Sequence, residues 1–217
     1  MIIDGRKVLY SVKGGVIQDP LISTDGLVCY LDTRGKTNTD KHRETLLNLS
    51  GNGNHGTLLN FGFNDESGYI NNLSDGLKFD GVDDQVTFND PIPLKGKRTC
   101  FIEFRIDESA SEQGGLVEIG GNMYIHNANN KIYFSSVPVV TVNTFPSGEY
   151  KIAYTQGADN SNPRFWANGL EDPLSPISTS ANPLPQGIRR LGKKVIKKLI
   201  IWNRVLTDEE ITKLMEG

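Results

Sequence analysis

The chain has 217 residues and a mass of 24.0 kDa, enough for one domain with a sizeable core. Its 23 Lys and Arg against 26 Asp and Glu give a formal net charge of −3, without the basic surface that nucleic acid or an anionic membrane requires. No apolar run approaches the roughly 20 residues of a transmembrane helix, and the first residues lack the apolar core of a secretory signal. We therefore expect a globular domain with no nucleic-acid partner, no membrane insertion and no signal peptide.

The first residues have the composition of an arm or linker. A short strand is expected at Lys7–Val12, and Gly14-Gly15 and Asp19-Pro20 follow it. We place the boundary so that residues 1–22 form an N-terminal arm or linker and residues 23–217 form the domain.

Short runs that alternate with period two predict many strands. The clearest is Cys100–Ile106, where alternate residues are apolar and would share one face of a sheet. The other expected strands are Gly26–Leu31, Leu77–Phe79, Gln85–Phe88, Leu116–Ile119, Met123–His126, Lys131–Phe134, Tyr150–Thr155, Arg164–Ala167 and Val195–Trp202.

Turn signals separate several of these strands. Asn127–Asn130 and Gly157–Pro163 each predict a hairpin, and Asn168-Gly169 is the typical two-residue type I′ turn. Residues 172–187 carry four prolines and are expected to form a long surface loop.

One helix is predicted, near the end of the chain. Thr207–Glu210 has the pattern of a capping box, and Ile211, Leu214 and Met215 follow at helical spacing. Many short strands with a single late helix predict an all-β fold, an antiparallel two-sheet sandwich.

Two cysteines, Cys29 and Cys100, each lie inside an apolar strand-like run. They form no CxxC pair and no disulfide framework, so we expect two buried thiols that pack as small apolar side chains.

Three motifs in one order carry a family resemblance: Ser50–Gly56, Phe79–Asp84 and Trp202–Ile211. With the opening strand Gly26–Tyr30 they resemble the laminin-G-like jelly-roll domain of the concanavalin A-like lectin/glucanase superfamily, over roughly residues 26–215. The insertion Asp32–Asp40 resembles the version of this domain found in bacteriophage virion proteins of the tail or fibre. The resemblance implies a jelly-roll sandwich, which is a scaffold and does not by itself fix a function.

Members of this superfamily often hold a structural calcium near the Ser-Gly-Asn-Gly turn, with backbone carbonyls and an acid of the last strand as ligands. The sequence departs from that pattern, because Lys197 and Lys198 stand in the last strand and Asn48 stands where aspartate is common. An ammonium group is one candidate for the cation position. We expect no cofactor; should calcium bind, the available carboxylates are Asp80, Asp83 and Asp84.

A catalytic role has little support in the sequence. The glucanases of the superfamily carry Glu-x-Asp-x-x-Glu on one strand, because glycoside hydrolysis needs two carboxyl groups close together. Glu103, Asp107 and Glu108 come nearest to this triplet, with the wrong spacing. His42, His55 and His126 show no metal spacing. We therefore expect a protein that is not an enzyme.

A sugar-binding module needs aromatic faces for stacking and amide or carboxylate groups for the hydroxyls. The candidates that follow residue 120 are Asn122, Tyr124, His126, Tyr133, Tyr154, Asp159, Asn160, Asn162 and Trp166. If Phe165 faces the core, Trp166 faces outward. The alternative is that these residues belong to the core and to loops.

The leading hypothesis is a non-enzymatic module of a phage tail, fibre or neck that binds host-surface carbohydrate. Its expected location is the virion, and its expected partners are a host cell-surface glycan, other virion proteins and further copies of itself on the particle. One alternative is a purely structural assembly or decoration protein that binds no sugar. Another is a glycan-cleaving enzyme with an unfamiliar acid pair.

Overall fold

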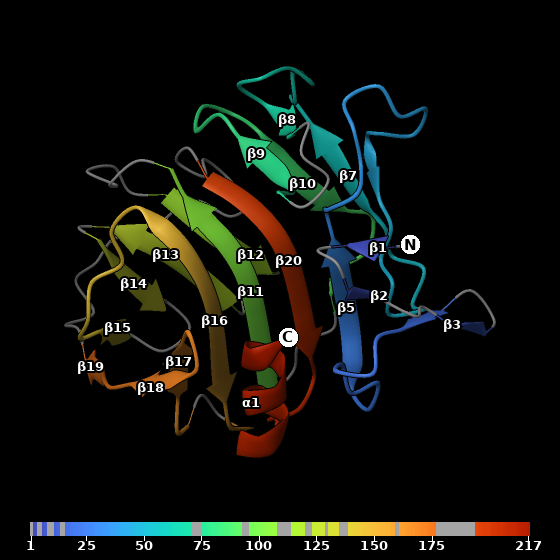
Figure 1. The fold of residues 1–217 in the computed structure, drawn as a ribbon. Coiled ribbons are helices and arrows are strands. Elements are labelled where there is room, and N and C mark those ends of the chain that lie inside the picture. The colour runs from blue at the N-terminus through green and yellow to red at the C-terminus, as the bar shows by residue number, and fades with distance from the viewer. Residues whose placement is uncertain are drawn as a thin grey trace.

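Figure 1 shows the computed structural model of the chain. It describes residues 2–3, 6–7, 11–13, 16–70, 75–92, 96–107, 114–119, 123–128, 130–134, 139–158, 161–176 and 194–217. Side chains are described from Asp19 onward within these ranges, apart from those of residues 114–119 and 123–128.

An eight-stranded antiparallel sheet forms the larger layer of the molecule. In spatial order its strands are β18 (Leu170–Asp172), β17 (Arg164–Ala167), β16 (Gly148–Gln156), β11 (Arg98–Ile106), β20 (Lys194–Trp202), β9 (Leu77–Phe79) and β8 (Gly68–Tyr69), with β5 (Leu27–Asp32) also on β20. The long strands β16, β11 and β20 lie side by side at its centre (Figure 1). The last strand of the chain thus joins β5 and β9, from the first half of the chain, to β11.

Two smaller sheets form the opposing layer. The first contains β10 (Gln85–Phe88), β7 (Gly56–Leu59) and β6 (Thr45–Leu46). The second contains β12 (Gly114–Ile119), β13 (Met123–Ala128), β14 (Lys131–Phe134), β15 (Val139–Thr141) and β19 (Leu174–Pro176). Buried side chains of both sheets share one apolar cluster with the larger sheet, so the predicted two-layer all-β sandwich is confirmed.

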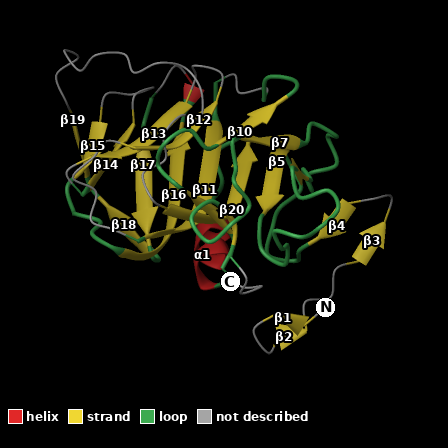
Figure 2. Ribbon diagram, turned by 90° about the horizontal axis from the view of Figure 1, so that it is seen from above, coloured by secondary structure: helices red, strands yellow, loops and turns green. Residues whose placement is uncertain are grey.

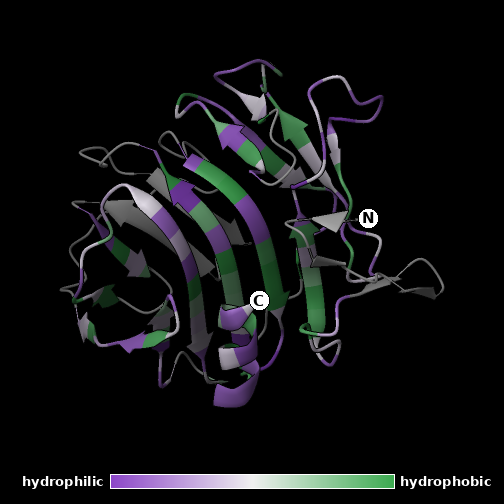
Figure 3. Ribbon diagram, in the orientation of Figure 1, coloured by the Kyte–Doolittle hydropathy of each residue, from purple (hydrophilic) through white to green (hydrophobic). Residues whose placement is uncertain are grey.

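The alternation predicted for Cys100–Ile106 is present in the structure. Cys100, Ile102, Phe104 and Ile106 lie in the core between the layers, whereas Phe101 belongs to a second cluster on the outer face of the sheet. Period-two burial on a strand follows directly from the pleat. Figure 3 shows β11 and β20 as largely hydrophobic strands interrupted by hydrophilic bands.

Helix α1 (Asp208–Glu216) covers part of the outer face of the larger sheet. Thr207 accepts from the backbone N–H of Glu210, and the Glu210 side chain accepts from the Thr207 N–H, so the predicted capping box is confirmed. The helix buries Ile211, Leu214 and Met215 against outer-face residues, as its spacing predicts. In Figures 1 and 2 the helix lies across the ends of β11 and β20.

The N-terminal residues form two short strand pairs, and the two ends of the strand predicted at Lys7–Val12 lie in one strand of each pair. β1 (Ile2–Ile3) pairs with β2 (Arg6–Lys7), and β3 (Ser11–Lys13) pairs with β4 (Val16–Gln18). Residues 8–10 lie outside the described residues. Two-residue and three-residue strands leave too few alternating positions for a period-two signal. The boundary at residue 22 stays a prediction, although Ile22 itself is buried in the outer-face cluster.

The proline-rich segment 172–187 is only partly a loop. Leu174–Pro176 forms β19 and pairs with β15, with Pro176 opposite Val139 at the end of the ladder. Proline is compatible with an edge strand because an edge residue does not need its N–H for pairing. Residues 177–187 lie outside the described residues.

The Asn168-Gly169 turn and the two cysteines match their predictions. Both turn residues have positive φ, 48° and 87°, as a type I′ turn requires. Cys29 and Cys100 are free, buried and on opposite sides of Ile201 in the sheet. Burial raises the pKa of Cys29 to about 12, so the thiol stays protonated at neutral pH. Within the described part of the chain, no helix combines the length and apolar character needed to cross a bilayer.

Lys194 generates the first testable prediction. The residue is 1% exposed, pairs with the core residues Phe79 and Ile106, and has no hydrogen-bond partner for its Nζ in the part of the chain described. Burial lowers its pKa from 10.5 to about 8. Lys194→Met should therefore raise the free energy of unfolding at pH 7, by on the order of 3 kcal/mol.

Chemical denaturation across pH tests this assignment. The unfolded chain binds more protons than the folded chain between pH 8 and 10.5, so wild-type stability should rise across that window and the advantage of Lys194→Met should shrink. Lys41→Met removes an exposed lysine and serves as the control. An equal effect of the two substitutions would contradict the prediction.

Arg204 is the basis of the second testable prediction. Its guanidinium donates to both carboxylate oxygens of Glu210, to the Asp25 carbonyl and to Ser23, and so joins the helix to the start of β5. The hydrogen bonds from Arg204 lower the pKa of Glu210 from 4.5 to about 2. Arg204→Met should lower stability at pH 7 by about 2 kcal/mol.

This loss has a defined pH window. Because the folded pKa of Glu210 is depressed, the stabilisation is present above pH 4.5 and disappears as the pH falls towards 2. Urea denaturation of wild type and variant should therefore converge at low pH; a constant difference would show that packing and not charge is lost.

Candidate functional site

The nine predicted sugar-contacting residues fall into separate places. Asn122, Asp159 and Asn160 lie outside the described residues. Asn162 is exposed in the loop between β16 and β17, with a φ of 48°. The remaining four aromatic residues and His126 lie on strands: Tyr124, His126, Tyr133, Tyr154 and Trp166.

Tyr154 belongs to the core, so the structure contradicts its prediction as a ligand contact. Its side chain is fully buried and stacks on Phe134 with ring centroids 4.2 Å apart, which joins the two layers. Its hydroxyl donates to Oε1 of Gln156 at 3.0 Å. The Tyr154–Phe134 pair is thus a structural contact between sheets.

Trp166 faces outward as the alternation predicted, but the outer face is covered at this point. Phe165 lies in the core, and Trp166 packs in the outer-face cluster with the residues of α1, only 6% exposed. The guanidinium of Arg164 lies 4.5 Å from the centre of the indole ring. The prediction of Trp166 as a sugar platform is therefore wrong, because the indole is buried in the outer-face cluster and Arg164 lies over its ring.

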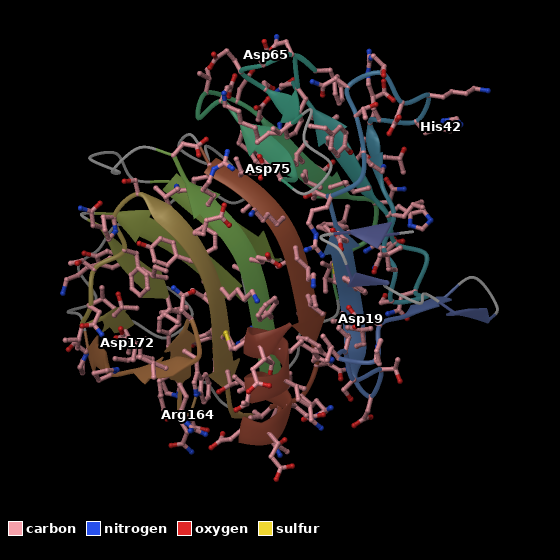
Figure 4. The ribbon with its side chains drawn as sticks, viewed as in Figure 1. Asp19, His42, Asp65, Asp75, Arg164 and Asp172 are labelled. Carbon is pink, nitrogen blue, oxygen red and sulfur yellow. The ribbon has the colours of Figure 1, made fainter. Side chains whose placement is uncertain are left out.

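Arg164 holds this cover in place. It donates to Glu171 at 2.8 Å and to Asp208, the first residue of α1, at 2.7 Å. Figure 4 shows Arg164 beside the lower end of the helix. Sequence reasoning missed this residue, because nothing in the sequence places Arg164 next to Asp208, 44 positions later.

Tyr124, His126 and Tyr133 are brought together by the register of the five-stranded sheet. His126 pairs directly with Tyr133, and Tyr124 lies two positions from His126 on β13. Tyr133 alternates on β14 with Ile132 and Phe134, both buried in the core. Paired positions share one face of a sheet. All three positions therefore lie on the outer face of this sheet, with Tyr133 half-buried.

The outer face of the larger sheet, beyond α1, carries ion pairs that the sequence analysis did not single out. Arg34 lies 2.6 Å from Asp32 and 3.8 Å from Glu103, and Lys197 lies 2.5 Å from Glu149. Hydrogen bonding to Asp32 raises the pKa of Arg34 above its ordinary value. The Glu103 and Arg105 positions of β11 were the only sequence signal for this surface, through their alternation with core residues.

The described carboxylates that come nearest to the catalytic triplet are also engaged in ion pairs. Glu103 faces Arg34, and Asp107 pairs with Arg105 at 2.5 Å. Asp75 also pairs with Arg105, at 3.4 Å, near the upper end of β20 in Figure 4. Glu108 lies outside the described residues. Carboxylates held by arginine are poor general acids, because the pairing favours their charged form.

The three predicted metal ligands Asp80, Asp83 and Asp84 do come together. One carboxylate oxygen of each lies within 4.8 Å of the others, in the turn between β9 and β10. Asp84 is buried and accepts from the Ser67 hydroxyl at 2.9 Å and from the Asp80 N–H at 2.8 Å. Burial raises the pKa of Asp84. These bonds account for the turn, and calcium binding here stays a prediction.

The turn after β6 lies along the free edge of β5. Asn48 accepts from the backbone N–H of Tyr30 at 2.9 Å, and the Leu49 N–H donates to the Tyr30 carbonyl at 2.7 Å. His55 accepts the Asn48 N–H at Nδ1, so its proton sits on Nε2 in this arrangement. His42 is exposed on a separate loop. The histidines form no common site among the residues with described side chains.

Comparison with known proteins gives a fold and no family. No family model and no curated protein sequence matches the chain. Among solved structures, Trypanosoma rangeli sialidase in complex with 2,3-difluorosialic acid is similar, with a TM-score of 0.60 and 15% identity over 96% of this chain. The receptor-binding domain of botulinum neurotoxin mosaic serotype C/D has a TM-score of 0.60 and 12% identity over 89% of this chain.

This chain spans about a third of the sialidase chain and about half of the neurotoxin domain, 35% and 51% respectively. At these identities the likeness shows the fold alone: an all-β sandwich. The particular relatives suggested by the sequence motifs are not among these structures, and the bacteriophage assignment stays a prediction.

Trp166 gives a prediction that separates a binding residue from a packing residue. Trp166→Ala should lower the free energy of unfolding by about 3–5 kcal/mol, because it removes a large side chain from beneath α1. Thermal and urea denaturation measure this loss. Leu170→Ala truncates an exposed side chain in the neighbouring strand and should change stability little. A fully stable Trp166→Ala protein would contradict the packing described here.

Proposed function

We propose that this chain is a non-catalytic carbohydrate-binding module that uses the outer face of the five-stranded sheet. The observation that carries the proposal is the register of β13 and β14, which pairs His126 with Tyr133 and places Tyr124 on the same face. Aromatic residues grouped on a sheet supply stacking surfaces, and imidazole and phenol groups supply hydrogen bonds to hydroxyls.

The other broad surface of the sandwich supports this choice by elimination. On the larger sheet, α1 covers the outer-face apolar cluster, and arginine–carboxylate and lysine–carboxylate pairs satisfy the charges beyond it. Among the similar structures, one is a sialidase in complex with 2,3-difluorosialic acid and another is the receptor-binding domain of a botulinum neurotoxin. These likenesses make a glycan ligand the favoured class for this chain.

The setting we propose is a phage tail, fibre or neck, where many copies act together. Its support is the sequence resemblance of the Asp32–Asp40 insertion to phage virion proteins. Binding at each site would be weak, and multiple copies on one particle would raise the overall avidity. Host-surface glycan and neighbouring virion proteins are the partners this setting implies.

A glycan array probed with the multivalent protein tests the proposal. His126→Ala and Tyr133→Ala should each weaken binding to the recognised glycan at least about tenfold, which corresponds to about 1.4 kcal/mol. His42→Ala is the matched control, because His42 is exposed and lies on the opposite side of the molecule in Figure 4. Circular dichroism confirms that each variant is folded.

The result also separates the alternatives. If no glycan binds the multivalent wild type, the proposal fails and a purely structural role is favoured. If His42→Ala reduces binding as much as His126→Ala, the binding face is misplaced. Release of sugar from a bound polysaccharide would show an enzyme and contradict the non-catalytic assignment.

A further inference from the structure

Among the described strands only β20 pairs with β5, so the other edge of β5 has no partner strand in this part of the chain. A strand whose outer edge has no partner strand leaves alternate N–H and C=O groups to be satisfied by other means. On β5 these groups belong to Val28 and Tyr30, and the Leu27 carbonyl lies at the end of the strand. In the domains that the sequence resembles, carbonyls near this turn are often bound to calcium.

In this chain side-chain donors already meet those carbonyls. The Val28 carbonyl accepts from Nδ2 of Asn52 at 3.2 Å, from Oγ of Ser50 at 3.3 Å and from Nδ2 of Asn48 at 3.4 Å. Nδ2 of Asn52 also lies 3.2 Å from the Leu27 carbonyl. A cation would need oxygen atoms here, whereas the position is lined by amide and hydroxyl hydrogens.

The orientation of the buried Asn48 side-chain amide is fixed by its hydrogen-bond partners. Oδ1 of Asn48 accepts the N–H of Tyr30 at 2.9 Å and the N–H of Ser50 at 3.1 Å. Turning the amide over would place its NH2 group against two N–H donors, so Nδ2 must face the Val28 carbonyl. Asn48 is 5% exposed, so its amide is buried together with these protein partners.

The last strand supplies no acid to this edge. The β20 residues opposite this end of β5 are Ile201, paired with Cys29, and Trp202, paired with Leu27, and both are fully buried. Lys198 pairs with Asp32, four residues further along β5 than Val28, and Lys197 pairs with Glu149 on β16. Lys197 therefore does not direct its ammonium group to this edge, because it is engaged with Glu149.

We infer that Asn48, Ser50 and Asn52 form a metal-free fastening of the β5 edge, so that this domain folds without calcium. The amide hydrogens stabilise the carbonyl oxygens as a cation would, because each brings a partial positive charge next to a carbonyl oxygen. This inference does not depend on the proposed function.

Thermal unfolding of the full chain in about 1 mM calcium or in excess EGTA tests it. All proteins carry Asp83→Asn, so that the cluster of Asp80, Asp83 and Asp84 does not contribute a second calcium response. In this background the melting temperature should be the same in both buffers. A drop of several degrees in EGTA, restored by calcium, would overturn the inference.

Adding Asn52→Asp to this background replaces an amide donor at the edge of β5 by a carboxylate. It places a carboxylate against the Leu27 and Val28 carbonyls, so the melting temperature should fall by several degrees in EGTA and recover in calcium. Asn162→Asp, at an exposed loop position, should do neither. An Asn52→Asp protein as stable in EGTA as its parent would show that Asn52 does not fasten β5, and would also overturn the inference.

Discussion

The structure depends on β20, a strand that must be paired on both edges and buried on both faces. It joins β11 to β5 and β9, and so connects strands from the start, middle and end of the chain. Its apolar residues divide between the inner core and the cluster beneath α1. A register shift opposite Glu103 and Phe104 leaves Lys197 out of the ladder with β11, which directs Ile196 into the core and lets Lys197 reach Glu149.

The covering of the larger sheet follows from that arrangement. The chain turns directly from Trp202 at the end of β20 into α1, so the helix packs on the outer face that Ile200 and Trp202 present. The apolar face of the helix and Trp166 are thereby buried in the same cluster. On the other side of the sandwich, the register of β13 and β14 pairs His126 with Tyr133. Trp166 faces outward on β17, yet it is buried in a cluster with α1, a helix distant from it in sequence.

The glycine- and asparagine-rich turn shows how one sequence motif can keep its structural role while its chemistry changes. The resemblance to lectin-type domains suggested calcium at this turn, but the asparagines direct amide hydrogens to the carbonyls of β5. The turn thereby protects a sheet edge that would otherwise offer hydrogen bonds to another chain.

The sequence by itself determined the elements whose signals are local. The predicted period-two runs coincide with β11, β14 and β20, and the predicted capping box with its apolar spacing coincides with α1. The alternation also placed Trp166 and Phe165 on opposite faces of β17. Only the tertiary structure decided which residues were covered: contacts over long sequence separation, Arg164 with Asp208 and Tyr154 with Phe134, accompany the burial of two predicted ligand residues, Trp166 and Tyr154. Alternation records that two faces differ, but the layer that covers a face is set by residues elsewhere in the chain.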